Sequence, residues 1–182
     1  MFHLDEYVGI SKGHPASFHK YLKERFVDIV KPGKYHLMNG EDAPEETIAR
    51  ISALLNERRV DLGLIGIGEN GHIAFNDPPV ADFHDTQTVK AVKLDEICRN
   101  QQVNDGCFAS IDQVPTHALT VTVSALARAP YLFCIVPAPS KAWAVKETLT
   151  GSIDEHCPAS ILRTHKSAVL YLDRDSAALL TL

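Results

Sequence analysis

Residues 62–78 read LGLIGIGENGHIAFNDP, and this stretch decides the fold class. Its first six residues form a short, continuous apolar run, which is typical of a strand buried on both faces of a parallel sheet. The run ends in a glycine-rich turn that carries Asn70, His72 and Asp77 within eight residues. Ligands of parallel sheets bind at the carboxyl ends of the strands. The stretch therefore predicts both a sheet and its functional edge.

Two amphipathic helices are expected before this strand. Residues 15–30 carry apolar side chains at helical spacing, and Pro32 and Gly33 end the pattern. A second helix is expected from about Pro44 to Arg59, with Asp42 as a plausible cap and acidic residues in its first turn. The side chains expected on the buried faces are Phe18, Leu22, Phe26, Ile29 and Val30 in the first helix and Ile48, Ile51, Leu54 and Leu55 in the second.

The chain after the first strand predicts further strands that alternate with helices. One helix has Ser140 as its expected cap and Gly151 as its expected stop. Residues 78–95 read as a long loop, and long loops in compact domains often serve as lids. The expected strands lie around 119–123 and at 131–136 and 168–172, and the expected helices at 140–149, 159–163 and 176–180.

This alternation predicts an α/β fold with a parallel sheet and helices on both faces, similar to a Rossmann arrangement. The length of 182 residues suits a single domain over residues 1–182, with enough apolar residues for a real core. The expected class is therefore a globular α/β protein with one ligand-binding sheet edge.

Composition excludes several function classes. The net charge is −5 and no block of Lys and Arg stands out, so neither a nucleic acid nor a membrane is the expected partner. No stretch is long and apolar enough for a membrane span, and the first residues lack a signal-peptide pattern. The four cysteines are widely spaced without a CxxC pair, which favours reduced structural thiols over a zinc or redox site. A cytoplasmic location is expected.

The glycine-rich turn carries the strongest functional signal. Gly66, Gly68 and Gly71 allow backbone amides to approach a ligand closely, and such a turn can hold an anion. A histidine beside a carboxylate can shuttle protons near neutral pH. The alternative is a histidine that is merely a satisfied polar residue of a loop. The GxGxxG spacing at 66–71 is not a dinucleotide fingerprint, because no clear helix follows it.

A second, weaker signal lies in LDEYVG at 4–9. Its adjacent carboxylates, Asp5 and Glu6, follow an apolar residue and could supply a general base. The alternative is an ordinary acidic pair on the surface.

Together these motifs resemble the glucosamine-6-phosphate deaminase/isomerase family. The resemblance covers nearly the whole chain, and its most specific segment is GHIAFN at 71–76. Phe75 and Asn76 favour the amino-sugar branch over the sister 6-phosphogluconolactonases. The matching segments are LDEYVGISKGHPASFH at 4–19, LIGIGENGHIAFNDPP at 64–79, VPTHALTVTVSAL at 114–126, PSKAW at 139–143 and CPASILRTH at 157–165.

The resemblance implies conversion of glucosamine 6-phosphate to fructose 6-phosphate and ammonia, with a sugar phosphate as the partner and no metal or organic cofactor. It implies that Asp5 is the base that moves the C2 proton and that His72 helps to open the pyranose ring. Asn70 and Asp77 are its implied relay partners. The implied phosphate contacts are Arg99 and Lys141, beside the ligand-facing amides expected at Gly68 and Gly71.

Three departures from the family pattern affect these expectations. Many members have aspartate at the position of Asn70, and most have glutamate at the position of Asp77, so this carboxylate is one methylene shorter. Family members also carry strands and a glycine- and threonine-rich phosphate loop before the Asp5 motif. We therefore expect an N-terminally truncated sheet with an exposed edge, and that edge favours a homo-oligomer.

Three other functions stay open from the sequence. The chain could be a sugar-phosphate-binding or regulatory relative without turnover. It could be a lactonase in which His72 activates water, although Phe75 and Asn76 oppose that assignment. It could also be a purely structural α/β unit.

Overall fold

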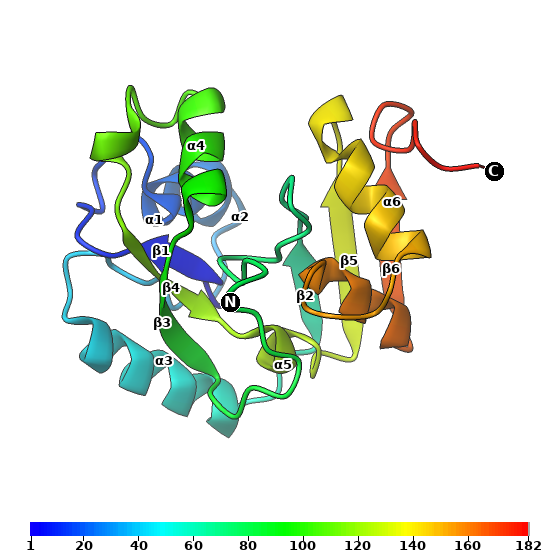
Figure 1. Cartoon of the computed structure of the whole chain (residues 1–182). Helices are drawn as coiled ribbons and strands as arrows, with labels where there is room; N and C mark the ends of the chain where they lie inside the picture. The colour runs from blue at the N-terminus through cyan, green and yellow to red at the C-terminus, as the bar shows by residue number, and fades with distance from the viewer. Residues whose placement is uncertain (182) are drawn as a thin grey trace.

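The computed structural model describes residues 1–181 and contains two three-stranded sheets that lie side by side (Figure 1). One sheet is parallel, with the strand order β2-β5-β6. The other is antiparallel, with the order β1-β4-β3. The strands are β1 (Asp5–Tyr7), β2 (Leu62–Ile65), β3 (Val89–Lys93), β4 (His117–Val121), β5 (Tyr131–Val136) and β6 (Ala168–Leu172).

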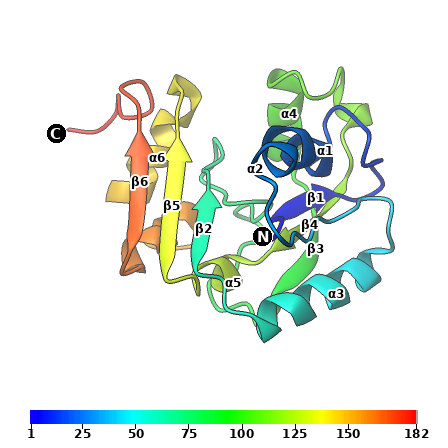
Figure 2. The same ribbon diagram turned by 180° about the vertical axis from the view of Figure 1, so that it is seen from behind.

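The parallel sheet confirms the α/β fold class and the strands expected at 131–136 and 168–172. The strand expected at 62–67 is also present, but it is buried on one face only. Its side chains alternate between exposed and buried, and Leu64 is 55% exposed. Helix α6 (Ala142–Thr150) covers one face of the parallel sheet (Figure 1). Figure 2 shows the sheet from its other face, with the strands in front of α6. Helical cover on both faces was therefore wrong for the described residues.

The antiparallel sheet was largely missed. Strand β1 is too short to show a period in the sequence, and it pairs with β4 so that Asp5 lies opposite Thr120. Strand β3 lies inside the segment expected to be the loop 78–95. Val123 was expected in a strand, but it begins helix α5 (Val123–Leu126), because the Thr122 side chain caps that helix by accepting from Ala125 N.

The helical segment near the N-terminus differs from the expected helix 15–30. It consists of α1 (Phe18–Leu22), a π-helical turn η1 (Lys23–Val27) and α2 (Asp28–Val30). The expected buried face is wrong at its end, since Ile29 is 71% and Val30 56% exposed. The π-turn changes the rotation of the side chains along the helix, and the residues after it turn toward solvent.

The second expected helix is confirmed as α3 (Pro44–Glu57), which packs beside β3. Its cap was wrong: Ala43 occupies the N-cap position, while Asp42 accepts a hydrogen bond from Asn39. Proline at the first helical position suits this start, because it lacks the amide hydrogen that a cap would satisfy.

Two of the three helices expected after residue 139 are present, with shifted ends or a different helix type. Gly151 ends α6 as expected, but the cap expected at Ser140 was wrong, because Ser140 lies in the 3-10 turn η3 (Pro139–Lys141). The short helix at 159–163 is the 3-10 segment η4 (Pro158–Thr164), and residues 176–180 form turns rather than a helix. The remaining helical elements are α4 (Glu96–Asn104) and η2 (Ile111–Gln113).

Two apolar clusters hold the fold together. The larger joins the covered face of the parallel sheet to α6 and includes Cys134, Val136 and Val145. The smaller surrounds Tyr7 and packs β1 against Phe75 of the glycine-rich loop. The loop thus lies between the two sheets and is held by both clusters.

Apolar surface remains open on the other side of the parallel sheet. Its exposed side chains come from all three strands, and β2 forms one edge of the sheet. A groove of about 990 Å³ adjoins this edge, lined by β2, the first helical segment and the start of the chain, including Asp5. The exposed residues of this face are Leu62, Leu64, Tyr131, Ile135, Val169 and Tyr171.

None of the described helices is long and apolar enough to cross a membrane.

Candidate active site

The glycine-rich loop that follows β2 positions His72. Gly68 N donates to His72 O at 2.9 Å, and Gly71 N donates to Gly68 O at 3.1 Å, so the loop closes on itself. A Cβ atom at Gly68 would lie only 2.1 Å from the His72 ring. Gly68 is therefore required for the imidazole to lie against the backbone of its own loop. Both amides are used inside the loop, so anion binding by Gly68 and Gly71 stays a prediction.

Gly71 connects the loop to the segment before η4. Its φ of +86° suits glycine, and a Cβ atom there would lie 2.6 Å from Cys157 Sγ. Its carbonyl accepts from Ala159 N at 2.8 Å. Packing against Cys157 therefore explains why residue 71 is glycine, whether or not a ligand binds there.

Asn76 fastens the far end of the loop to β4. Its buried amide donates to Ile73 O, to Thr120 Oγ1 and to Val121 O at 2.9–3.2 Å. Phe75 N also donates to Thr120 Oγ1, at 3.1 Å. Because Thr120 pairs with Asp5 across β1 and β4, the same residue positions the loop and the strand that bears Asp5.

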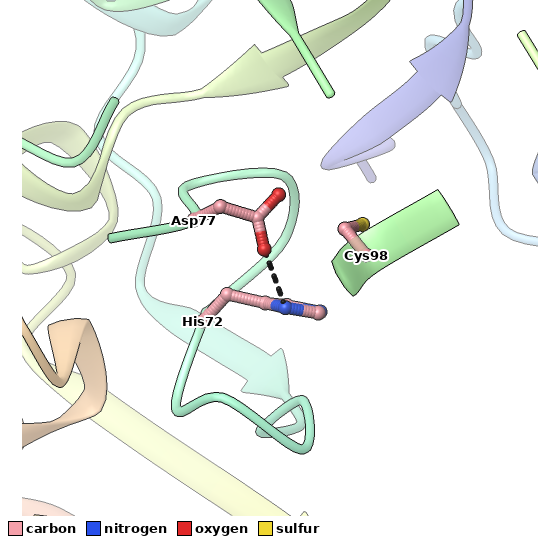
Figure 3. A group of neighbouring side chains, drawn as sticks. All are labelled: His72, Asp77 and Cys98. Carbon is pink, nitrogen blue, oxygen red and sulfur yellow. Dashed lines mark ion pairs between the residues drawn. The ribbon is translucent and has the colours of Figure 1, made fainter. Parts of the chain in front are cut away.

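Asn70, His72 and Asp77 form one hydrogen-bonded network. His72 Nδ1 lies 2.9 Å from Asp77 Oδ1 (Figure 3). The same nitrogen lies 2.7 Å from Asn70 Oδ1. Asn70 Nδ2 also donates to Asp77 Oδ1, at 2.8 Å. The structure therefore brings together the three relay residues predicted from the sequence. The aspartate reaches His72 although it is one methylene shorter than glutamate.

The network determines which histidine nitrogen carries the proton. Two oxygen acceptors face Nδ1, so Nδ1 carries hydrogen and Nε2 keeps its lone pair. Burial, the largest influence, raises the pKa of Asp77, but the hydrogen bond and charge of His72 outweigh it. The pKa of Asp77 is therefore held below its ordinary value. An ionised Asp77 then stabilises His72 when the imidazole takes up a proton.

Asp5 lies close enough to this network for its charge to interact with His72. Burial is the main influence on its carboxyl group, followed by the charge of Glu6. Together they raise the pKa of Asp5 to about 7. A carboxylate with a pKa near neutral pH is suited to take up and return a proton.

Glu6 has a structural role instead of forming an acidic surface pair. Its fully buried carboxylate accepts from Ser17 Oγ and His19 N, both at 2.7 Å, and from Tyr7 N at 2.9 Å. These donors include the start of α1, so Glu6 ties that helix to β1. The two adjacent carboxylates therefore have different environments and different tasks.

The predicted phosphate contacts lie on other elements. Lys141 ends η3 at the carboxyl end of β5, the same sheet edge as the loop after β2, because the two strands are parallel. Arg99 lies on α4, and its Nη2 donates to Ile111 O and Val114 O at 2.6 and 3.0 Å. Arg99 thus supports the η2 segment, and no contact places either cation beside His72. Their phosphate role stays a prediction.

Cys98 is the neighbour of this site that sequence reasoning missed. It lies in the first turn of α4, where Asp95 caps the helix by accepting from Cys98 N at 2.6 Å. Candidate ligand atoms of His72, Asp77 and Cys98 all lie within 4.8 Å of one another (Figure 3). Burial raises the pKa of the Cys98 thiol, and the charge of Asp77 raises it further. Asp77 and Cys98 are 21 residues apart in the sequence, and no spacing pattern predicts that they lie close together.

Residues 1–171 match the family of glucosamine-6-phosphate isomerases and 6-phosphogluconolactonases. The chain belongs to this family. Members of the family are found among curated relatives and solved structures, and most of this chain aligns with them.

Two curated relatives of this family are glucosamine-6-phosphate deaminases. That of Listeria monocytogenes serotype 4a is 35% identical over 178 residues, which cover 97% of this chain and 74% of the relative. That of Exiguobacterium sibiricum is 36% identical and covers 98% of this chain and 69% of the relative. The chain thus spans about three quarters of the length of these relatives.

Solved structures of the family agree with the fold. A monomeric glucosamine-6-phosphate deaminase is 35% identical, with a TM-score of 0.89 over 98% of this chain and 74% of that chain. A 6-phosphogluconolactonase from Trypanosoma brucei is 15% identical, with a TM-score of 0.75 over 99% of this chain and 73% of that chain. At this low identity, the lactonase shows only that the fold is shared.

Proposed function

We propose that this chain converts glucosamine 6-phosphate and water to fructose 6-phosphate and ammonia. The observation that carries the proposal is the half-buried Asn70–His72–Asp77 network near Asp5, whose pKa is raised to about 7. The network provides a histidine that can transfer a proton between the sugar's oxygens. Asp5 provides a base that can remove a proton from carbon. The deaminase relatives at 35–36% identity support the choice of substrate.

Ring opening is the first task. His72 Nε2 takes the proton from the anomeric hydroxyl and returns it to the ring oxygen as the bond from C1 to that oxygen breaks. Asp77, being ionised, stabilises the transient imidazolium, and Asn70 keeps the ring oriented. The product of this step is the open-chain aldehyde.

Proton transfer between carbons is the second task. Asp5 removes the C2 proton, the electron pair forms a C1–C2 double bond, and the carbonyl pair of C1 moves to O1, which takes up the proton that the amino group loses. The protonated Asp5 returns the proton to C1, which leaves an imine at C2. Water adds to this imine and ammonia leaves, so that fructose 6-phosphate forms. The carboxylate must be ionised to begin, and its pKa of about 7 suits it to both halves of the transfer.

The phosphate requires cations or amides from an otherwise acidic chain. We assign this task to Arg99 and Lys141, with backbone amides near Gly68 and Gly71. Lys141 lies at the same sheet edge as the loop, which supports its part in the assignment. No organic cofactor or metal takes part in these steps.

A panel of two substrates tests this proposal. We expect the reduced 182-residue chain to release fructose 6-phosphate from glucosamine 6-phosphate and to leave 6-phosphogluconolactone at its spontaneous rate of hydrolysis. Asp5→Asn is expected to abolish release while its far-ultraviolet circular dichroism stays that of the wild type. Saturable substrate binding without product would support a binding-only relative and contradict the proposal, as would faster lactone hydrolysis.

The predicted partners and location complete the proposal. We place residues 1–182 in the cytoplasm as a single catalytic domain that self-associates. The β2 edge, the adjoining groove and the open apolar face support self-association. The solved deaminase relative is described as monomeric, so the oligomeric state needs its own measurement.

A further inference from the structure

Three side chains near the relay have the donor atoms of a metal site. His72 offers an imidazole nitrogen, Asp77 a carboxylate oxygen and Cys98 a thiol, and these atoms lie within 4.8 Å of one another. Ligands around a tetrahedral zinc ion stand about 3.3–3.8 Å apart, as follows from bonds of about 2.0–2.3 Å. Side-chain movements of about 1 Å would therefore bring all three onto one ion.

An unsatisfied oxygen points to the same place. Asp77 is 1% exposed, and its Oδ2 has no hydrogen-bond partner among the described residues, although Oδ1 accepts from Asn70. A buried carboxylate oxygen without a donor costs free energy, and a cation beside it removes that cost. The Cys98 thiol hydrogen-bonds to the Asp77 carboxylate, so a cation held by both groups would replace that contact and satisfy the free oxygen.

Charge and chemistry restrict the choice of ion. A divalent cation bound by ionised Asp77, the Cys98 thiolate and a neutral His72 forms a site with no net charge, which suits a buried position. A thiolate and an imidazole favour Zn²⁺ and Co²⁺ over Mg²⁺ and Ca²⁺, which prefer oxygen ligands. Three protein ligands leave the fourth position of a tetrahedral ion open.

We propose that His72, Asp77 and Cys98 form an inhibitory site for a thiophilic divalent cation such as Zn²⁺. On binding, the thiol proton leaves to solvent as the sulfur–metal bond forms, and the Nδ1 proton of His72 leaves while Nε2 takes one up, so that neutral His72 binds the ion through Nδ1 with no change of oxidation state. The ion occupies Nδ1 of His72 and leaves Nε2 protonated, so His72 can no longer take the anomeric proton in ring opening. The inhibitory effect rests on the proposed function, whereas metal binding itself does not.

Cobalt provides a probe of binding that does not need activity. Co²⁺ titrated into the reduced 182-residue chain is expected to give a thiolate-to-cobalt charge-transfer band in the near ultraviolet. Zn²⁺ should remove this band by displacement and Mg²⁺ should not. Absence of the band in the wild type, or displacement by Mg²⁺, would overturn the proposal.

Matched cysteine variants assign the thiolate. Cys98→Ser is expected to lose the band, while Cys107→Ser, which alters an exposed cysteine on the segment after α4, keeps it. His72→Ala provides a second variant, expected to keep the thiolate band but to bind Co²⁺ at least about ten-fold more weakly. A band that persists in Cys98→Ser, or unchanged affinity in His72→Ala, would contradict the assignment.

The inhibition is measured separately, as the ratio of turnover with and without Zn²⁺ for each protein. Zn²⁺ should slow the wild type and Cys107→Ser alike, and Cys98→Ser should need at least about ten-fold more Zn²⁺. Equal sensitivity of Cys98→Ser would overturn the inhibitory role. A Cys98-dependent cobalt band in a chain without turnover would contradict the proposed function alone.

Discussion

At the scale of single residues, the pair of Asp77 and His72 is the feature on which the proposed ring opening depends. Asp77→Asn keeps the shape of the side chain but removes the charge that stabilises the imidazolium and holds Nδ1 protonated. We expect kcat to fall by about 10²–10⁴-fold with little change in KM. Steady-state kinetics with glucosamine 6-phosphate measure both.

A surface pair of the same two residue types serves as the control. Asp154 and His156 lie 3.5 Å apart, and His156 is almost fully exposed. Asp154→Asn should leave turnover unchanged. If Asp77→Asn and Asp154→Asn had equal kcat, the relay would have no role in catalysis.

Gly68 makes a second prediction, because its missing side chain leaves the space for the His72 ring. Gly68→Ala would place a methyl group 2.1 Å from that ring and force it to move. A displacement of about 1 Å can cost about 100-fold in rate, so we expect a loss of that size in kcat. Gly33→Ala is the matched control, since a Cβ there meets nothing within 4 Å. Wild-type turnover in Gly68→Ala would show that the ring position is not required.

Residue-level patterns predicted part of this site. Asn70, His72 and Asp77 share one loop, so their spacing was sufficient to group them, and the structure connects them by hydrogen bonds. Cys98 and the structural role of Glu6 depend on contacts between distant segments. Such contacts arise from how β1 and α4 pack, and a local pattern does not contain that information.

At the scale of elements, the segment from β2 to β3 is fastened to the antiparallel sheet by the pair of Asp85 and Lys90. Lys90 Nζ lies 2.8 Å from Asp85 Oδ2 and donates to Val80 O at 2.6 Å. Burial, the largest influence, raises the pKa of Asp85. The bonds from Lys90 and from Gln87 N outweigh it and lower that pKa below 3.8.

The sign of the pH effect follows from this lowered pKa. Asp85 contributes to stability when it is ionised, and that contribution is lost as the pH falls through its pKa in the folded protein. We expect Asp85→Asn to lower the free energy of unfolding by about 1–2 kcal/mol at pH 7. The difference should be unchanged at about pH 5 and shrink below pH 3.8. Urea unfolding at each pH measures it, and a difference that grows in acid would contradict this role.

Strands were predicted correctly where a continuous apolar run marks them in the sequence. Strands β5 and β6 lie at the expected residues, because apolar runs bounded by turn residues identify them. It failed at β1 and β3, which are short and gain their order from pairing with β4. It also failed at the end of the first helix, where the π-turn rotates Ile29 and Val30 toward solvent.

At the scale of the whole molecule, we propose that the open face of the parallel sheet governs self-association. We expect the chain's average mass to rise with concentration, because apolar side chains of β2, β5 and β6 are exposed together. Leu64→Asp should lower that mass toward the monomer without unfolding the chain, since Leu64 is on the exposed face of β2. Leu179→Asp alters an exposed leucine outside the sheet and is the control. Light scattering that gives one monomer mass at all concentrations would contradict self-association.

The central claim is that Asp5 moves the carbon-bound proton of an amino-sugar phosphate. The most direct test is the rate of fructose 6-phosphate release from saturating glucosamine 6-phosphate, measured from about pH 5 to about pH 9. Because burial raises the pKa of Asp5 to about 7, the account predicts a rate that rises through about pH 7 and disappears in Asp5→Asn. Turnover by folded Asp5→Asn, with the same pH profile as the wild type, would contradict it.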